Sequence, residues 1–534
     1  MTERPNASDI WKEIAWPEVK ARVFRLQVRI HEAALRKDRK RCHQLMRLLV
    51  GSWDAKRLAV RQVAEENGGA GTAGVDGVKS ISPAACLKLA RDLTIRGPVD
   101  PVLRRWIPKK GTAEMRPLGI PTIRARAQQA LLVLALEPWF EAIAEPGVYG
   151  YRKGRGCADA LYRIRSGILR SPRWVLDADI EKFFDRVDHD ALLAKVDAPG
   201  FMKSAIRRML KARILCDGEL LDPETGTPQG GVLSPLLANL VLHGLETMLA
   251  QAPHQGKPWL CVRYADDFVV LTDTREDAVK AQALVSAWLA PMGLNLKNSK
   301  TRIAHTLHRV DCAPAGFDFL GVRVWQKQLG KYGGKESLGN VVTLLHPSAK
   351  SVAAHVASLG ELFRSVQCPE GLISAANRKI RGWVGYFRAF NAKSAFSTLD
   401  HHLWWTSWKW GRRNFKGLGK RERKARLYPK GWRFEPATGY RLCLHAETPI
   451  HRHTLVRSDA RYFSREWHYW ATRTGRYPLV PDGLAALLKR QNGRCMACGD
   501  RLTGRVMVTR AAKDGRLSAC HAPTCSEAVS SGRS

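Results

Sequence analysis

The chain has 534 residues, which is too many for one hydrophobic core and predicts three or more domains. Its hydrophobic content of 45% is typical of a globular protein and excludes a mostly disordered chain. The 87 Lys and Arg residues against 49 Asp and Glu residues give a formal net charge of +38, which favours a nucleic-acid partner and leaves a ribosomal or merely basic protein as the alternative.

The first two thirds of the chain alternate between helical and mixed patterns. Residues 10–65 carry apolar side chains at helical spacing between Lys and Arg residues, which predicts two or three basic amphipathic helices. The glycine-rich segment 67–77 predicts a loop. Residues 100–325 alternate short β-rich runs with helical stretches, as in an α+β domain. Residues 350–412 return to a helical pattern and are rich in tryptophan.

The C-terminal third is basic and then rich in cysteine. Segment 409–430 holds ten Lys or Arg residues and one acid, Glu422. Four of the 12 cysteines cluster beyond residue 480, which favours a metal site over disulfides. The sequence shows no signal pattern at its start and no apolar run of about 18 residues. We therefore expect a soluble, cytoplasmic protein of bacterial type, associated with the nucleoid when bound to DNA, and no membrane partner.

Two segments place acids inside runs that otherwise predict buried strands. They are residues 174–180 (Trp-Val-Leu-Asp-Ala-Asp-Ile) and 261–271, which contains Tyr-Ala-Asp-Asp. Burying unpaired carboxylates costs several kcal/mol, so adjacent Asp residues indicate a tight hairpin or a cation site. Nucleotidyl transfer needs such a cluster, because two Mg²⁺ ions about 3.5–4 Å apart assist the attacking and leaving oxygens. Without metal, crowding should raise some carboxyl pKa values. Asp177 and Asp179 share one strand face, so both remain candidates.

These residues match a known family. Tyr-Ala-Asp-Asp at 264–267, with Asp-Ile-x-x-Phe-Phe-Asp at 179–185, resembles the polymerase core of group II intron reverse transcriptases. The resemblance implies a right-hand polymerase with an antiparallel sheet in the palm, two Mg²⁺ ions, and catalytic metal ligands Asp179, Asp266 and Asp267. Asp179 is preferred to Asp177 because the family places a bulky aromatic residue five positions later, here Phe184. Phe184 is implied to lie beneath the sugar and select deoxynucleotides.

Supporting blocks appear in the family's order. Residues 105–109 and 116–121 resemble the fingers, 149–155 resembles a block that contacts template or nucleotide, and 226–235 resembles the block near the template–nucleotide pair. The resemblance implies that Lys109 and Arg116 hold the triphosphate and that Gln229 contacts the pair. It also implies that Lys300 assists the leaving pyrophosphate, with a surface ion pair as the alternative. The residues implied to bind substrate are therefore Lys109, Arg116, Phe184, Gln229 and Lys300.

Beyond the palm, residues 377–387 and 403–410 resemble the maturase (thumb) domain, although a tryptophan-rich helical core would give the same pattern. The implied RNA-binding residues are Lys409, Arg412, Arg413 and Lys416. Basic helices beside aromatic side chains suit structured RNA, and 6–10 phosphate contacts predict about a 10³-fold loss of affinity from 50 to 200 mM salt. Residues 440–477 resemble the family's DNA-binding region less closely. His451 and His453 there are expected to be structural or to face phosphates.

The tail from residue 487 begins like an HNH endonuclease. Cys495 and Cys498 form a Cys-x-x-Cys half-site, and Cys520 and Cys525 would complete a structural Zn²⁺ site. Such a nuclease needs a histidine general base about a dozen residues after the first pair, but residues 507–510 read Met-Val-Thr-Arg. His521 suits neither role. We therefore expect a zinc-knuckle remnant without endonuclease activity.

We expect a multidomain α+β protein divided at 1–85 (RNA-binding extension), 86–330 (fingers and palm), 345–430 (thumb), 431–478 (DNA-binding region) and 479–534 (tail). The expected partners are group II intron RNA, a DNA target and primer, and deoxynucleoside triphosphates; the oligomeric state stays open, a homodimer included. The leading hypothesis is a reverse transcriptase that promotes splicing of its intron and copies the intron into DNA during retrohoming. The alternatives are a non-catalytic splicing cofactor and an intron-independent reverse transcriptase of the phage-defence or CRISPR-linked kind.

Overall fold

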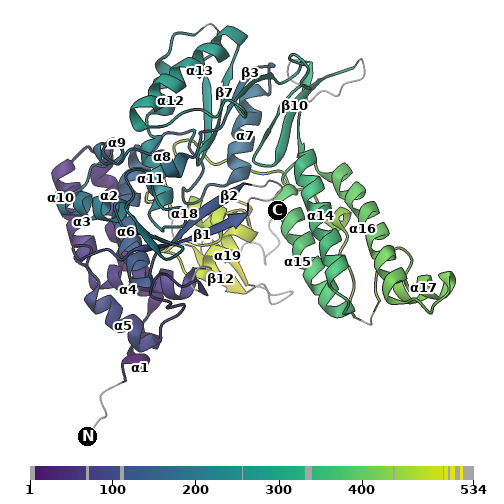
Figure 1. Ribbon diagram of the computed structural model, residues 1–534, viewed down its shortest axis with the longest axis horizontal. Helices are drawn as coiled ribbons and strands as arrows, with labels where there is room; N and C mark the ends of the chain where they lie inside the picture. Colours follow the sequence, from purple (N-terminus) through teal and green to yellow (C-terminus); the bar gives the residue numbers. More distant parts are fainter. Residues whose placement is uncertain are drawn as a thin grey trace.

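The structure, a computed structural model, describes residues 6–67, 71–108, 114–254, 256–330, 340–436, 439–496, 498–502, 506–510 and 517–520. Its elements gather in three masses (Figure 1): N-terminal helices with a small sheet, a second sheet covered by helices, and a helical arm that projects to one side. Antiparallel strand pairs predominate, and helices surround the sheets. The predicted α+β class is therefore confirmed.

The N-terminal mass is built on helices that pack around one long apolar helix, α6 (Ile123–Ile143). Helix α2 packs along α6 through Val19, Val23 and Ile30, which are buried. The sequence predicted two or three helices over residues 10–65, and α2, α3 and α4 lie in this range. The helices that pack beside α6 are α2 (Trp16–Leu35), α3 (Arg39–Gly51), α4 (Trp53–Arg61) and the π-helix η1 (Gln62–Glu66). Helix α5 (Pro83–Asp92) packs on α4 and on α1 (Ala7–Lys12).

A small mixed sheet, in the order β2-β1-β4-β5, extends from this mass toward the centre of the molecule. Strand β1 runs antiparallel to β2 and parallel to β4, so the sheet joins two distant parts of the chain. Its strands are β1 (Val102–Pro108), β2 (Met115–Ile120), β4 (Ile214–Cys216) and β5 (Glu219–Leu221).

The central sheet, in the order β6-β7-β3-β8, is antiparallel throughout. Side chains alternate between its faces: Leu176 and Val270 join the core that contains α13, whereas Val175 and Val269 join the core that contains α7. Because helices cover both faces, the strands are apolar apart from their ends. The elements are β3 (Trp174–Ala178), β6 (Leu260–Tyr264), β7 (Asp267–Thr272), β8 (Arg302–His305), α7 (Cys157–Ile168) and α13 (Arg275–Leu289).

Short helices connect the central sheet to the N-terminal mass. Helix α8 directly follows β3, and α11 is an apolar helix whose N-terminal turn contains Pro235. The connecting elements are α8 (Phe183–Arg186), α9 (His189–Ala194), α10 (Gly200–Leu210), α11 (Ser234–Val241), α12 (Leu245–Gln251) and the 3-10 helix η3 (Ala290–Met292).

A three-stranded antiparallel sheet, β11-β10-β9, leads from the central sheet to the helical arm, defined here as α14–α17. The core of the arm includes Leu359, Phe363, Ile380 and Trp410. The predicted helical stretch 350–412 corresponds to α14, α15 and most of α16. The elements are β9 (Phe317–Phe319), β10 (Val322–Gln328), β11 (Val341–Pro347), α14 (Ala349–Ser365), α15 (Pro369–Phe387), α16 (Lys393–Asn414) and α17 (Lys420–Leu427).

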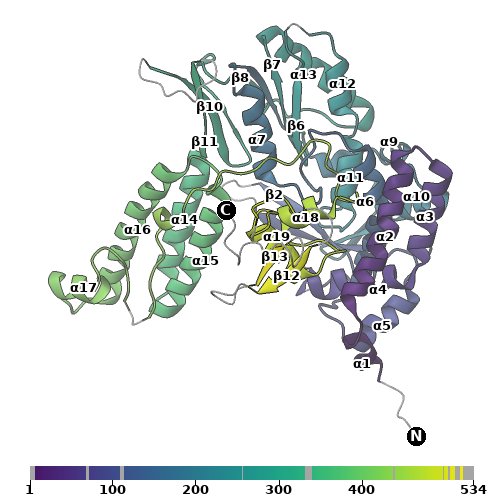
Figure 2. The same ribbon diagram turned by 180° about the vertical axis from the view of Figure 1, so that it is seen from behind.

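The C-terminal segment returns from the arm to the body, and Figure 2 shows α18, α19 and the β12–β13 hairpin between the N-terminal helices and the arm. Phe463 stacks on Phe24 of α2, with ring centroids 5.6 Å apart, and Arg465 pairs with Glu32 of the same helix at 2.8 Å. In the part of the chain that the structure describes, no helix is long and apolar enough to cross a membrane. The elements are η4 (His445–Glu447), α18 (Trp467–Thr474), α19 (Asp482–Arg490), β12 (Met507–Arg510) and β13 (Leu517–Cys520).

Asp159 on α7 anchors this returning segment. The buried carboxylate accepts hydrogen bonds from the His453 ring at 2.8 Å and the Val456 backbone N–H at 2.9 Å, and it also pairs with Arg473. These cationic and N–H partners outweigh burial and lower the pKa of Asp159. The expectation that His453 is structural is met, and residues 453–477 pack on α2 and α7.

Candidate active site

A two-residue hairpin between β6 and β7 carries two of the predicted catalytic acids. Tyr264 pairs with Asp267, which leaves Ala265 and Asp266 at the tip. Ala265 has a positive φ of 60°, a conformation that costs a non-glycine residue energy and is typical of tight hairpins and of functional sites. The sequence predicted an Asp-Asp tip; the tip lies one residue earlier, and Asp267 begins β7.

Asp179 emerges beside this hairpin. Ala178, the last residue of β3, pairs with Phe268 of β7, so Asp179 follows the strand at the level of Asp267. The Lys300 ammonium lies 2.7 Å from the Asp179 carboxylate. Lys300 is held in place by its own loop, because the Lys297 backbone N–H donates to the Asp179 carbonyl at 2.8 Å. The structure thus brings Asp179, Asp266, Asp267 and Lys300 together.

The carboxylates in this cluster influence one another electrostatically. The neighbouring protein atoms, which partly exclude water from the carboxylate, raise the pKa of Asp267 to about 6 together with the charges of Asp266 and Asp179. Asp267 is nevertheless exposed at the surface. Burial, and then the Asp179 charge, raise the pKa of Asp266. The hydrogen bond with Asp179 raises the pKa of Lys300. The predicted rise in carboxyl pKa values is therefore found.

Three acids of this kind suit a hard divalent cation, which prefers carboxylate oxygens and relieves repulsion between them. In the ranges described above, however, no group of three or more His, Cys, Asp or Glu side chains is already arranged to hold a metal ion. The counter-charge on Asp179 is instead the Lys300 ammonium. The acids fit Mg²⁺ by donor chemistry and by their raised pKa values, but Lys300 must share or release Asp179 when a cation binds.

A pocket of about 380 Å³ opens directly beside these acids. It brings Asp266 together with three of the residues predicted to bind substrate: Arg116 from β2, Phe184 from α8 and Gln229 from the following glycine loop. A neighbouring cavity of about 420 Å³ shares Phe184 and Gln229 and extends toward Trp106 of β1. The volume, and a cation and a carboxylate in one lining, are suited to a nucleoside triphosphate with its metal ions. Lys109, the fifth predicted substrate residue, lies outside the described residues.

The glycine loop around Gln229 lies close against Phe184. Gly226 has a φ of 86°, and a Cβ there would lie 2.7 Å from the Phe184 carbonyl oxygen. The Thr227 backbone N–H donates to the same oxygen at 2.6 Å, and the Gln229 carbonyl accepts from Gly119 of β2 at 2.6 Å. Only glycine allows this approach. The loop therefore fixes the Phe184 backbone and joins it to the small mixed sheet.

A buried arginine supports the hairpin from behind. Arg263 of β6, which is 2% exposed, donates to the Asn239 side-chain oxygen at 3.1 Å, and Asn239 donates to the Gly150 carbonyl at 2.9 Å. A Cβ on Gly150 would lie 2.2 Å from the Ala265 nitrogen, so this position requires glycine. The network holds the 149–155 block against the hairpin and stabilises the unusual backbone of Ala265.

The 149–155 block contributes less to the site than its resemblance implied. Tyr151 lines the pocket, and burial followed by the charges of Asp266 and Asp267 raises its pKa. Arg152, by contrast, is buried in a bidentate pair with Glu141, with both distances 2.8 Å. Its guanidinium stabilises the fold, because removing one partner of such a buried pair would leave an uncompensated charge.

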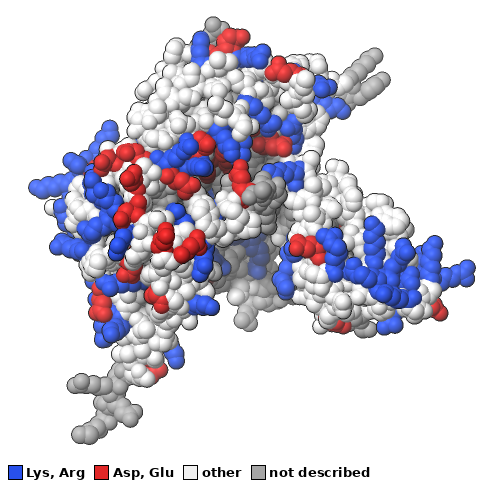
Figure 3. Space-filling view, in the orientation of Figure 1, with Lys and Arg blue, Asp and Glu red and all other residues white. Residues whose placement is uncertain are grey.

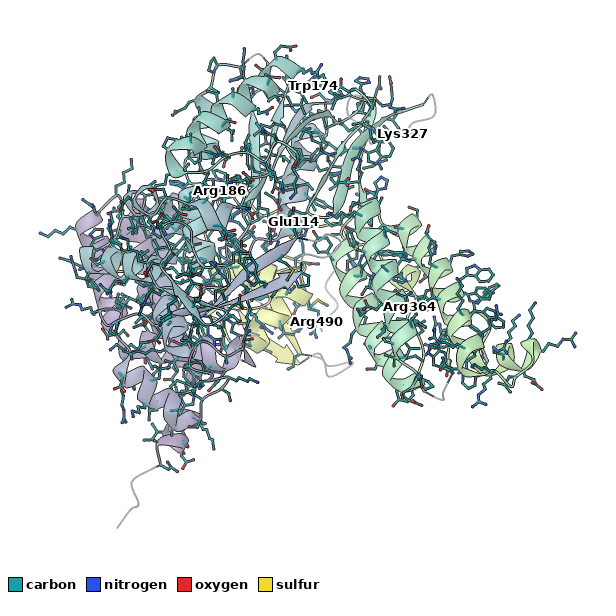
Figure 4. All side chains as sticks on the ribbon, in the orientation of Figure 1. Glu114, Trp174, Arg186, Lys327, Arg364 and Arg490 are labelled. Atoms are coloured by element: carbon teal, nitrogen blue, oxygen red, sulfur yellow. The ribbon has the colours of Figure 1, made fainter. Side chains whose placement is uncertain are left out.

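Two further ion pairs near the acids were not anticipated from the sequence. Arg302 on β8 pairs with Asp177 at 2.9 Å, and strand register places these two residues opposite one another. Arg186, labelled in Figure 4, pairs with Glu181 at 2.6 Å. The alternation that puts Asp177 and Asp179 on one face also puts Lys300 and Arg302 on one face of the neighbouring segment. This matched spacing was the available signal for both ion pairs, Arg302 with Asp177 and Lys300 with Asp179.

The helical arm carries the predicted RNA-binding cations, and Figure 3 shows Lys and Arg gathered over its outer end. Lys409, Arg412 and Lys416 are exposed. Arg413 instead donates to the backbone carbonyls of Phe363 and Arg364 on α14, and Figure 4 labels Arg364 within the arm. Arg413 therefore joins α16 to α14 and has fewer donors available for phosphate.

The cysteine tail is described only in part. Cys495 and Cys520 are buried, Cys498 is exposed, and Cys525 and His521 lie outside the described residues. The Cys495 backbone N–H donates to the Asp500 carbonyl at 2.8 Å, and Gly499 donates to the Cys495 carbonyl at 3.0 Å. Met507 pairs with Cys520, so the Met-Val-Thr-Arg segment forms a strand of a small hairpin.

Three protein families match the chain in order. The N-terminal domain of reverse transcriptase matches residues 11–93, the reverse transcriptase (RNA-dependent DNA polymerase) family matches 107–324, and the maturase-specific domain of group II introns matches 351–428. The reverse transcriptase match contains the central sheet and all three acids. The maturase-specific match contains the helical arm apart from the first two residues of α14.

Individual relatives match over different lengths. Protein YkfC of Escherichia coli (strain K12) is 28% identical over 366 residues, 60% of this chain and 91% of that protein. The group II intron-encoded protein LtrA of Lactococcus lactis is 38% identical over 154 residues, 28% of this chain but only 26% of LtrA. Maturase-like protein 1 of Euglena gracilis is 25% identical over 332 residues, 58% of this chain and 64% of that protein. With its three domains in this order, the chain belongs to the family of group II intron-encoded reverse transcriptases and maturases.

Proposed function

We propose that this chain is an RNA-directed DNA polymerase whose catalytic acids are Asp179, Asp266 and Asp267, and that it also binds and folds a group II intron RNA. The observation that carries the proposal is the meeting of these acids beside a pocket that Asp266 lines together with Arg116, Phe184 and Gln229. Carboxylates drawn from two strands 88 positions apart in sequence meet here because β3 and β7 pair in register.

The residues of the pocket have distinct proposed roles. Arg116 would pair with the triphosphate, because a guanidinium forms charge-assisted hydrogen bonds with phosphate oxygens. Phe184 would lie under the sugar and leave no room for a 2′-hydroxyl. Gln229, placed by the glycine loop, would contact the template–nucleotide pair. Lys109, outside the described residues, remains a predicted contact of the triphosphate.

The acids would bind the two Mg²⁺ ions, which when present would supply Lewis-acid assistance to the attacking 3′-hydroxyl and the leaving pyrophosphate. Lys300 now pairs with Asp179 at 2.7 Å. As cations bind the carboxylates, its ammonium would leave Asp179 and pair with the pyrophosphate. Arg302 holds Asp177 aside at 2.9 Å, so Asp177 would remain a structural partner and not a ligand.

We assign the large regions by the same reasoning. The small mixed sheet with α6 would be the fingers, the central sheet with α7 and α13 the palm, and α14–α17 the thumb. Residues 1–85 would form an RNA-binding extension. Residues 431–478 are proposed to contact DNA. Because residues 453–477 within this region pack on α2 and α7, bound DNA would lie beside the body of the enzyme.

For the tail we propose a structural remnant without endonuclease activity. No histidine occupies residues 507–510, where a nuclease of this kind would need its general base. A zinc ion on Cys495, Cys498, Cys520 and Cys525 remains a prediction that the described residues do not support by themselves. Metal analysis of the purified protein, with nicking of target DNA by the ribonucleoprotein as the second readout, tests both statements.

Primer extension on an RNA template with a DNA primer, Mg²⁺ and deoxynucleotides tests the polymerase. Asp266→Asn keeps the shape of the side chain but removes its charge, so single-nucleotide incorporation should fall by about 10³-fold or more, as for removal of a dominant electrostatic contributor. Asp311→Asn is the matched control, because Asp311 is 80% exposed and lies 3.8 Å from Arg275, away from the pocket. Equal activity in the two variants would contradict the assignment.

Splicing assays separate the alternatives. A non-catalytic cofactor would stimulate splicing of a group II intron precursor RNA but make no cDNA. An intron-independent reverse transcriptase would make cDNA without stimulating splicing. The proposed function requires both splicing stimulation and cDNA synthesis in one preparation. It also requires Asp266→Asn to lose cDNA synthesis while keeping splicing stimulation.

A further inference from the structure

Four tryptophans lie at the outer end of the helical arm: Trp404 and Trp408 are partly buried against its core, and Trp405 and Trp432 are exposed. Trp404, Trp405 and Trp408 lie on α16, and Trp432 lies on the loop that follows α17. Trp432 is 78% exposed and Trp405 is 47% exposed. Leaving two such large rings in water forgoes a substantial hydrophobic gain, so an exposed cluster of this kind indicates a binding surface. We call these four residues the aromatic patch.

The rings of the aromatic patch are ordered against one another. Trp404 and Trp408, one helical turn apart, are parallel within 3° with centroids 6.0 Å apart. The Trp432 ring lies 5.7 Å from Trp404. Buried residues on either side hold the Trp432 loop: the Tyr428 hydroxyl bonds to Ser407 at 2.8 Å, and Phe434 packs on Trp410 at 5.6 Å. The exposed ring is therefore presented by a fixed backbone.

Cations continue the same rows of the helix. Residues four apart on a helix are neighbours, so Arg412 follows Trp408 and Lys409 follows Trp405. Both cations are exposed. Segment 409–430 holds ten Lys or Arg residues and one acid, Glu422, whose carboxylate already accepts the Gly419 N–H at 3.0 Å. Aromatic rings and exposed cations therefore lie side by side at this end of the arm, and Figure 3 shows the basic residues gathered there.

We propose that the aromatic patch is a stacking site for unpaired bases of a bound RNA, with Lys409 and Arg412 contacting the adjacent phosphates. This inference rests on the proposed RNA-binding function and adds the kind of RNA that the arm takes. An A-form duplex hides its base faces, whereas a single-stranded loop or flank offers them to aromatic rings. A protein surface would use the rings but would need many acids to match the surrounding charge, so RNA is favoured.

The test measures binding of full-length protein to a 12-nucleotide oligouridine and to the same strand annealed to its complement. Stacking on an aromatic ring contributes about 1–3 kcal/mol per base, so Trp432→Leu should weaken single-strand binding about fivefold or more and change duplex binding by less than twofold. Trp432→Phe keeps an aromatic face and should restore most of the affinity. Val279→Ala, at an exposed apolar residue on α13 of the central body, is the control and should bind like the parent protein.

The salt dependence identifies the contact as stacking. Trp432→Leu should leave the slope of log affinity against log salt unchanged, whereas Arg412→Gln should reduce it by about one phosphate contact. Unchanged single-strand binding in Trp432→Leu would overturn the inference and leave the aromatic patch to a protein partner. An equal loss for single strand and duplex would overturn it as well. Primer extension by the parent protein distinguishes the two proposals. If the parent protein makes cDNA but Trp432→Leu binds the single strand as tightly as the parent does, the stacking inference fails and the proposed polymerase function stands.

Discussion

The central sheet and the helical arm both carry clustered charges, but the sheet holds its acids in a fixed arrangement whereas the arm exposes its cations to solvent. In the sheet, Asp179, Asp266 and Asp267 crowd together, and the structure fixes them with paired strands and a buried arginine below. In the arm, Lys409 and Arg412 stand exposed on a helix beside unburied tryptophans. Chemistry requires charges held in a set geometry, whereas binding a long polyanion requires charges that solvent and ligand can reach.

The first way to sharpen this comparison is to alter the shape of the pocket while leaving its charges alone. Phe184→Ala removes the ring proposed to exclude a 2′-hydroxyl, so the preference for deoxynucleotides over ribonucleotides should fall on the order of 10- to 100-fold. Competing single-nucleotide incorporations measure this ratio. Phe183→Ala is a poor control because Phe183 is buried, so Trp106→Ala in the neighbouring cavity serves instead. A ratio unchanged in Phe184→Ala would remove the proposed role.

Removing the positive charges of the arm should weaken RNA binding and leave nucleotide incorporation nearly unchanged. A triple variant with Gln at Lys409, Arg412 and Lys416 should weaken RNA binding about 10-fold at moderate salt and lower the salt slope by two to three contacts, because each lost cation releases fewer counterions. Incorporation at saturating template should change little. Arg413→Gln should act differently, since Arg413 bonds to α14 carbonyls, and should lower thermal stability. Binding by the triple variant equal to that of the parent would contradict the assignment of the arm.

The smallest expected effect concerns the stability of the metal-free protein. The pKa of Asp267 is raised to about 6, above its unfolded value, so its charged form is less stable in the folded protein. The destabilisation is absent below about pH 4, grows as pH rises through 6, and is full above it. Asp267→Asn should therefore increase the free energy of unfolding at pH 7.5 by about 1 kcal/mol, a figure reduced for solvent screening at an exposed position.

Thermal unfolding in EDTA at pH 4 and pH 7.5 checks this sign. The gain should vanish at the lower pH, and added Mg²⁺ should stabilise the parent protein more than Asp267→Asn. A variant that is destabilised at pH 7.5 in EDTA would show that Asp267 makes favourable contacts that outweigh the repulsion.

Local patterns predicted the elements that position the chemistry. Acids within apolar runs indicated both the end of β3 and the β6–β7 hairpin, since few other arrangements tolerate buried carboxylates. The hairpin tip was displaced by one residue, because Ala265 accepts the positive φ with support from Gly150 and Asn239 far along the chain. Helical spacing indicated the arm, whereas the resemblance to the maturase domain implied its cations at 409, 412 and 416, which are exposed.

Local sequence patterns could not predict ion pairs and hydrogen bonds between residues that lie far apart in the sequence. Arg152, in a block that resembled a template or nucleotide contact, is buried in a pair with Glu141, and Arg413, although exposed, bonds to α14 carbonyls. Asp159 meets His453 across 294 positions, with nothing in either neighbourhood to indicate it. The sequence of a motif does not show whether a charged residue in it forms an ion pair or a hydrogen bond with a distant part of the chain.

The most direct measurement compares two neighbouring acids on one strand. Asp177→Asn and Asp179→Asn change the same group two positions apart, with Asp177 held by Arg302 and Asp179 beside Asp266 and Asp267. Rapid-quench incorporation with Mg²⁺ should show a loss of about 10³-fold or more for Asp179→Asn and less than about 10-fold for Asp177→Asn. Equal losses, or a greater loss for Asp177→Asn, would contradict the three-acid site.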